Sequence, residues 1–142
     1  PLYSSAASDV YKRQIKVKGS LLVGVIGDEA TVTGFLLTGI GERNKNGEAN
    51  FLIVTKDTSL SQIESAFSKM VANPEMGIIM ISQNIAEAIR NKIAEHEEVL
   101  PTIMEIPSKD VPYDPTKDTV LCKAARMLYG TEVGMQKLQQ LD

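Results

Sequence analysis

The sequence contains little of what metal centres and histidine-dependent catalysis require, since it has one histidine, one cysteine and no tryptophan. Cys122 has no second cysteine with which to form an internal disulfide or share a zinc ion, and this usage suits a reducing compartment such as the cytosol. His96 stands among glutamates, so neither a catalytic triad nor a multi-histidine metal site can be built around it. We therefore expect a solvated His96, a structural Cys122, and neither a metal nor a cofactor.

Long apolar runs and an excess of basic residues are also absent. No stretch approaches the ~20 continuous apolar residues that span a bilayer, and the first residues lack the apolar core of a secretory signal. The formal net charge is −3, whereas nucleic acids and anionic membrane surfaces favour basic patches. We expect no nucleic-acid partner and no direct membrane insertion, so that any membrane association comes through partner proteins.

The composition is that of one ordinary globular domain, with 43% apolar and 23% charged residues in 142. Residues 1–14 are small, polar and aperiodic, and we expect a disordered leader or a remnant that is not native to the protein. The predicted organisation is a leader (1–20), a sheet domain (21–107), a proline-rich connector (108–117), a C-terminal helix (118–130) and a loose tail (131–142).

Four short apolar runs predict buried strands, at residues 21–27, 50–55, 77–82 and 101–106. Helical periodicity separates them. Asp28 is placed to cap the first helix, and Ser59 with Gln62 forms a capping box for the second. A third helix should bury an isoleucine stripe and expose Glu87 and Arg90. The alternation predicts an α/β fold with a four-stranded parallel sheet of order 2-1-3-4, flavodoxin- or receiver-like, with helices on both faces.

The last helix follows a segment stiffened by Pro107, Pro112 and Pro115. Its apolar stripe can either fold back onto the sheet or lie on a partner helix, and we favour the partner. The predicted interface residues are Tyr113 of the connector and Val120, Leu121, Ala124, Ala125, Met127 and Leu128 of the helix.

The carboxyl ends of the predicted strands, where ligands bind in such folds, offer little chemistry. Gly27 and Gly34 match neither the dinucleotide-binding nor the P-loop spacing, and Asp28 and Glu29 put negative charge where a phosphate would sit. A phosphoacceptor receiver domain is the alternative, because Asp28, Glu29 and Lys109 could fill its magnesium and lysine positions. The third strand, however, ends in 82–84, Ser-Gln-Asn, without the aspartate that accepts the phosphoryl group, so the receiver would be degenerate.

Three motifs in order resemble the F subunit of the eukaryotic vacuolar ATPases, over about residues 21–130. They are VIGDEATVTGFLL with GIG at 25–41, SQNIAEAIR at 82–90, and EIPSKD with PYDP at 105–115. The chain departs from this family's pattern in two respects. Val111 stands where histidine is usual, and the last helix is less basic.

The resemblance implies a non-catalytic subunit of the central rotor, in the cytosolic ATP-hydrolysing sector at vacuolar and endosomal membranes. It implies that the sheet domain sits beside the coiled coil of the D subunit, that the C-terminal helix runs along that coil, and that torque passes to the membrane ring through the d subunit. The catalytic A/B hexamer would be an indirect partner. The resemblance also implies a part in silencing the detached sector, and we expect the loop at 42–49 to be a second contact.

Overall fold

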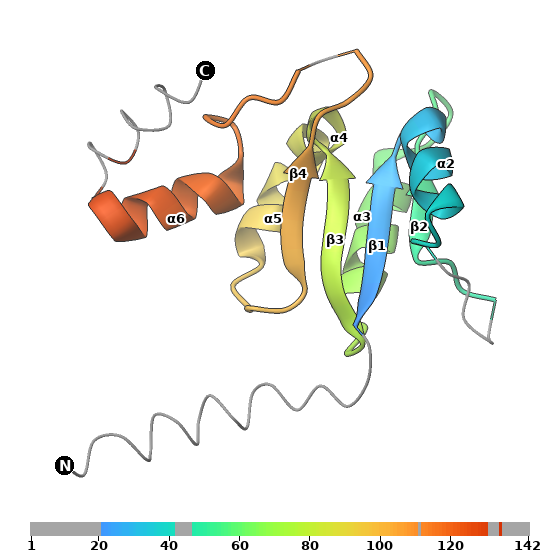
Figure 1. Ribbon diagram of the computed structural model, residues 1–142, viewed down its shortest axis with the longest axis horizontal. Helices are drawn as coiled ribbons and strands as arrows, with labels where there is room; N and C mark the ends of the chain where they lie inside the picture. Colours follow the sequence, from blue (N-terminus) through green and yellow to red (C-terminus); the bar gives the residue numbers. More distant parts are fainter. Residues whose placement is uncertain (1–20, 42–46, 111, 131–133, 135–142) are drawn as a thin grey trace, which may run out of the picture.

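The computed structural model describes residues 21–41, 47–110, 112–130 and 134, and its nine elements form one sheet flanked by helices (Figure 1). The elements are β1 (Leu22–Gly27), α2 (Glu29–Leu37), β2 (Phe51–Ile53), α3 (Leu60–Val71), β3 (Met76–Ser82), α4 (Gln83–Ala88), α5 (Arg90–Glu95), β4 (Thr102–Ile106) and α6 (Thr119–Tyr129). All strand pairs are parallel, in the order β2-β1-β3-β4, which confirms the predicted sheet. The leader, most of the 42–49 loop, Val111 and most of the tail lie outside the described residues.

Helices pack on both faces of the sheet. Ile26, Ile79 and Phe67 belong to one buried cluster that joins the sheet to α3, α4 and α5. Neighbouring residues of a strand point to opposite faces, so Val25 faces away from that cluster, towards the side where α2 contacts β1 and β2. Val25 and Val32 of α2 are both fully buried. Burial of a valine- or isoleucine-sized side chain is worth about 1.5–3 kcal/mol, so this core supplies most of the stabilisation.

The edge strand β4 shows the alternation most clearly. Ile103 and Glu105 are buried, whereas Met104 between them is 47% exposed. The odd-numbered residues of β4 therefore point to the side that carries α4 and α5. This parity brings a carboxylate, that of Glu105, into a buried position beneath these helices.

The third predicted helix differs from the expectation because the structure breaks it into α4 and α5. Ile89 adopts φ −115° and ψ 26°, and its amide donates to the carbonyl of Ala86, three residues back, at 3.2 Å. Such a tightened turn interrupts the α-helical ladder and lets α5 start in a new direction. The prediction that Arg90 is solvent-exposed is therefore wrong, since its side chain is 27% exposed and ion-paired to Glu105.

His96 also departs from the expectation of a solvated side chain. It is partly buried at the end of α5, where its Nε2 lies 2.9 Å from the carbonyl oxygen of Pro101. Because a carbonyl oxygen only accepts, Nε2 carries the proton. His96 thus ties the end of α5 to the start of β4.

Side-chain caps begin α2 and α3 at the residues the sequence indicated. Asp28 is the N-cap of α2, and its carboxylate accepts the Thr31 amide at 3.3 Å and the Thr31 hydroxyl at 2.5 Å. The hydroxyl bond is the main reason that the pKa of Asp28 lies below its usual value. At α3, the Ser59 hydroxyl accepts the Gln62 amide while the Gln62 side chain accepts the Ser59 amide at 2.8 Å.

The carboxyl end of β3 packs closely against that of β1. Ser82 is fully buried, and a Cβ at Gly27 would lie 3.0 Å from its hydroxyl oxygen, so only glycine allows this approach without a shift. The Ser82 Oγ has no hydrogen-bond partner among the residues that the structure describes. A buried hydroxyl without a partner costs about 1–3 kcal/mol of desolvation.

Alanine substitutions at two serines should therefore change stability in opposite directions. We expect Ser82→Ala to raise the free energy of unfolding by about 1 kcal/mol, because it removes the unsatisfied hydroxyl. Ser59→Ala should lower it by about 1 kcal/mol, because it removes the cap of α3. Urea unfolding followed by circular dichroism measures both changes, and a Ser82→Ala variant less stable than the parent would contradict this description of Ser82.

Candidate partner interface

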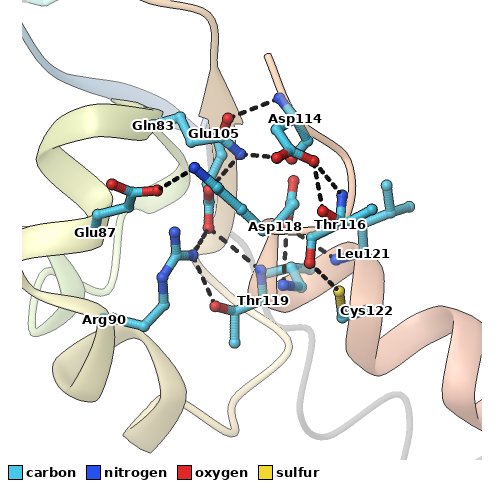
Figure 2. Close-up of polar contacts among 12 residues, drawn as sticks. Gln83, Glu87, Arg90, Glu105, Asp114, Thr116, Asp118, Thr119, Leu121 and Cys122 are labelled. Carbon is cyan, nitrogen blue, oxygen red and sulfur yellow. Dashed lines mark hydrogen bonds and ion pairs between the residues drawn. The ribbon is translucent and has the colours of Figure 1, made fainter. Parts of the chain in front are cut away.

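The connector between β4 and α6 is fastened to the sheet domain by Gln83, the first residue of α4. Its side-chain Nε2 donates to the carbonyl oxygen of Asp114 and its Oε1 accepts the Asp114 amide, each at 2.8 Å (Figure 2). Gln83 is only 4% exposed, so these bonds form away from solvent. In a receiver domain the carboxyl end of β3 would carry the phosphoacceptor. Here the residue that follows β3, Gln83, holds the connector that leads to α6.

Within the connector, carboxylates organise the turn that precedes α6. Asp114 accepts the amide of Thr116 at 2.9 Å and its hydroxyl at 2.6 Å, and the hydroxyl bond is the main cause that lowers the pKa of Asp114. The Tyr113 hydroxyl donates to Asp118 at 2.6 Å. Burial raises the pKa of Tyr113 well above its usual value, and the bond to Asp118 adds to the increase. Tyr113 therefore supports the connector from within.

One surface ion pair adds to this fastening. Lys117 Nζ lies 3.3 Å from Glu87 Oε1, and both side chains are about half exposed. Exposed pairs of this kind contribute about 0–1 kcal/mol, so the buried bonds of Gln83 matter more.

The helix α6 stands beside α5 and β4 and does not cover the sheet (Figure 1). The side chains of the predicted interface separate into two groups. Val120 is 37% exposed, Leu128 75% and Met127 84%. Ala124 is also exposed, whereas Leu121 is partly buried.

Ala125, which the sequence placed on the partner face, is buried within the chain. It is 7% exposed, and a Cβ at Gly134 would lie 2.7 Å from its carbonyl oxygen. Only glycine allows the backbone at 134 to approach α6 so closely. A helical wheel of α6 could not reveal this contact. The contact depends on the position of Gly134, which follows Gly130 with its positive φ of 80°.

Cys122 packs on the connector. Its Sγ donates to the carbonyl oxygen of Thr116 at 3.2 Å, and burial raises the pKa of the thiol. A buried, protonated thiol is a poor nucleophile, in keeping with a structural residue.

The remaining strand ends bring no catalytic cluster together among the described residues. Asp28 is engaged as a cap, Ser82 is fully buried, and Lys109 is exposed on the connector. No group of three or more potential metal ligands occurs in the described ranges. This arrangement gives the receiver hypothesis no support. None of the described helices has the length and apolarity to cross a bilayer.

A groove with a volume of about 760 Å³ lies elsewhere, between α3, the turn that follows it and the segment that enters β2. Charged and amide side chains line it: Lys69 of α3, Asn73 of the following turn, and Glu48 of the segment before β2. It touches neither the connector nor α6.

Comparison with known proteins places most of the chain in one family. The family model described as ATP synthase (F/14-kDa) subunit matches residues 23–123. The F subunit of the V-type proton ATPase of Homo sapiens is 51% identical over 106 residues, covering 75% of this chain and 89% of that protein. The corresponding protein of Dictyostelium discoideum is 52% identical over 106 residues, covering 75% and 88%. Among solved structures, the F subunit of the V-type ATP synthase of Archaeoglobus fulgidus has a TM-score of 0.46 at 24% identity, covering 62% of this chain and 99% of that one.

The role of Gln83 is testable with its exposed neighbour Asn84 as the matched control. We expect Gln83→Ala to speed amide exchange and proteolysis in residues 112–118 and to lower stability by about 1–3 kcal/mol, because it unpairs the amide and carbonyl of Asp114. Asn84→Ala should change neither quantity appreciably. Equal protease sensitivity of the two variants would show that Gln83 does not hold the connector.

The burial of Cys122 predicts slow thiol chemistry. At pH 8 the folded chain should react with a disulfide reagent at least about 100 times more slowly than the urea-unfolded chain. As a control, a thiol at exposed position 123, in a Cys122→Ser, Lys123→Cys variant, should react fast.

The raised pKa of Cys122 also fixes the sign of a pH effect. The folded state holds this proton more tightly, so the contribution to stability is complete below about pH 8.5 and is lost as the pH rises through the folded pKa. The Cys122→Ser variant should lack this alkaline loss when the two chains are unfolded with urea across pH 7–10. Identical pH profiles of the two chains would contradict it.

Proposed function

Because the chain belongs to the family of ATP synthase (F/14-kDa) subunits, we propose that it is a non-catalytic central-stalk subunit of a V-type proton ATPase, joined through α6 to a coiled-coil partner, the D subunit. The observation that carries this proposal is the exposed apolar stripe of α6. Relatives about half identical to the chain, which are named as F subunits of V-type proton ATPases, support its place in such an assembly.

The stripe has the spacing that helix–helix contacts use. Val120, Ala124, Met127 and Leu128 follow one another at i, i+4, i+7 and i+8, so they fall on one side of the helix. Lys123 and Arg126 lie outside it, along one edge, and both are exposed. An apolar stripe with charged residues along one edge is a surface that a partner helix can cover.

The side chains exposed on this stripe are large enough to support binding. Covering a methionine or leucine side chain is worth about 1.5–3 kcal/mol, which corresponds to more than tenfold in affinity for each. The small Ala124 between them allows a partner backbone to approach. We therefore assign the central contact to Met127 and Leu128.

In this proposal ATP hydrolysis belongs to the A/B hexamer, and the chain transmits rotation. The d subunit would receive torque on the membrane side, and the chain would lie on the cytosolic face of vacuolar and endosomal membranes without inserting into them. The loop at 42–49 would be a second contact, and a part in silencing the detached sector would follow from the position on the rotor.

Charge placed on the stripe should weaken the association, and the chain offers a matched control. We expect Met127→Asp and Leu128→Asp each to weaken binding to the D subunit at least about tenfold, because a carboxylate would be buried without a partner. Leu37→Asp should bind like the parent, since Leu37 on α2 is 84% exposed, like Met127, but lies on a different element. Titration calorimetry with the purified D subunit measures the affinities.

Two results would contradict the proposal. One is a parent chain that stays monomeric when the D subunit is supplied. The other is loss of binding in the Leu37 variant that equals the loss in the two α6 variants.

A further inference from the structure

The amino end of α6 is capped by a residue that belongs to the sheet. Glu105 Oε1 accepts the amide of Thr119, the first residue of α6, at 3.3 Å. Its other oxygen, Oε2, accepts Nε2 of Gln83 at 3.1 Å. The Glu105 side chain is completely buried, and it lies between β4, α4 and α6 (Figure 2).

Two carboxylates divide the free amides of the first turn of α6. The first amides of a helix have no partner within it. Asp118 accepts those of Val120 and Leu121, each at 2.9 Å, as an ordinary N-cap. Glu105 takes the Thr119 amide from outside the helix. Negative charge at this end is also favoured by the helix dipole, so both caps stabilise the turn.

Arg90 adds a second hydrogen bond to Thr119, from a different element. The same guanidinium nitrogen, Nη1, donates to Glu105 Oε1 and to the Thr119 hydroxyl, the latter at 2.8 Å. Arg90 opens α5, so the first residue of α6 is held by β4 and α5 together. A hydrogen bond fixes both a distance and an angle, and two of them from different elements restrict how α6 can swing.

Beyond this first turn the helix has few buried contacts. Among the described side chains of α6 only Cys122 and Ala125 are buried. The stripe that carries the proposed function has no such restraint. The polar contact at Thr119 is therefore the direct hydrogen-bonded link from α6 itself to β4 and α5 among the described residues.

We propose that Glu105, Arg90 and Thr119 act as positioning residues that hold α6 in its outward direction before a partner arrives. A partner then docks on a preformed surface and does not have to order the helix. Preformed surfaces bind faster and more tightly, because ordering a segment costs free energy at the moment of binding. The identity of the partner rests on the proposed function, whereas the restraint on α6 is a property of the free chain.

The substitution Thr119→Val tests the restraint with little risk to the fold. It keeps the shape of Thr119 and its amide, but it removes the hydroxyl that Arg90 contacts. Thr119→Ser keeps the hydroxyl and should behave like the parent. Thr33→Val, at an exposed threonine of α2, is the matched control for the change from hydroxyl to methyl.

Distances between two spin labels report the direction of α6 in the free chain. The labels sit on Ser68→Cys of α3 and Lys123→Cys of α6, both exposed positions, in a Cys122→Ser background that keeps a donor for the Thr116 carbonyl. Pulsed electron paramagnetic resonance should give one narrow distance distribution for the parent, Thr119→Ser and Thr33→Val. Thr119→Val should at least double its width.

The same unlabelled variants are then mixed with the D subunit. We expect the association rate of Thr119→Val to fall about tenfold although its apolar stripe is intact, and that of Thr119→Ser to match the parent. An unchanged distance distribution in Thr119→Val would overturn the positioning role, whatever the binding result. A broadened distribution in a chain whose parent does not bind the D subunit would uphold the positioning role and overturn the proposed function instead.

Discussion

The burial of the Glu105 carboxylate is the constraint on which the arrangement of the carboxyl-terminal half depends. A charge with no exposure to water is tolerated only when it is paired and its oxygens are hydrogen-bonded. Gln83, Arg90 and the amide of Thr119 supply those bonds from α4, α5 and α6. Loss of Arg90 would leave the charge uncompensated, and loss of either neutral donor would remove a hydrogen bond from a buried oxygen. The positions of three helices relative to β4 are therefore linked through one side chain.

This link explains how a small domain can present a helix outward. The sheet and its covering helices form a core that is complete without α6, since the main buried cluster contains no residue of that helix. The connector is hydrogen-bonded to Gln83 at the start of α4, and this places the first residue of α6 beside Glu105. The helix is thus held firmly at its first turn, while Met127 and Leu128, in its last turns, stay exposed. The chain belongs to the family of ATP synthase (F/14-kDa) subunits, and a subunit of a complex has other chains beside it that an outward helix could contact.

The fold was largely predictable from the sequence, because it depends on local patterns. Continuous apolar runs indicated strands of a parallel sheet, and the caps at Asp28 and Ser59 stand directly before the helices that they begin. The family was likewise recognisable from its motifs, as the comparisons confirm. These features need only neighbouring residues, or the order of elements along the chain.

The polar contacts around α6 were not predictable in the same way. Gln83 and Asp114 are 31 residues apart in the sequence. Arg90 was expected to be solvent-exposed, but its surroundings depend on the break at Ile89, which the helical pattern did not reveal. One signal was available: Glu105 alternates with Met104 in a short strand, and an acid at an inward position of a strand requires a buried partner. The contact of Ala125 with Gly134 had no such signal, because it depends on the return of the chain.

Amide hydrogen exchange of α6, in the free chain and with the proposed partner, the D subunit, shows whether the first turn is held before binding. In the free chain we expect the amides of Thr119, Val120 and Leu121 to be protected already, because Glu105 and Asp118 accept them. Addition of the D subunit should slow exchange in the following turns, around Met127 and Leu128. Two results would contradict the proposed role of α6: exchange in the first turn at the rate of an unfolded peptide until the partner is added, or no change in the last turns on its addition.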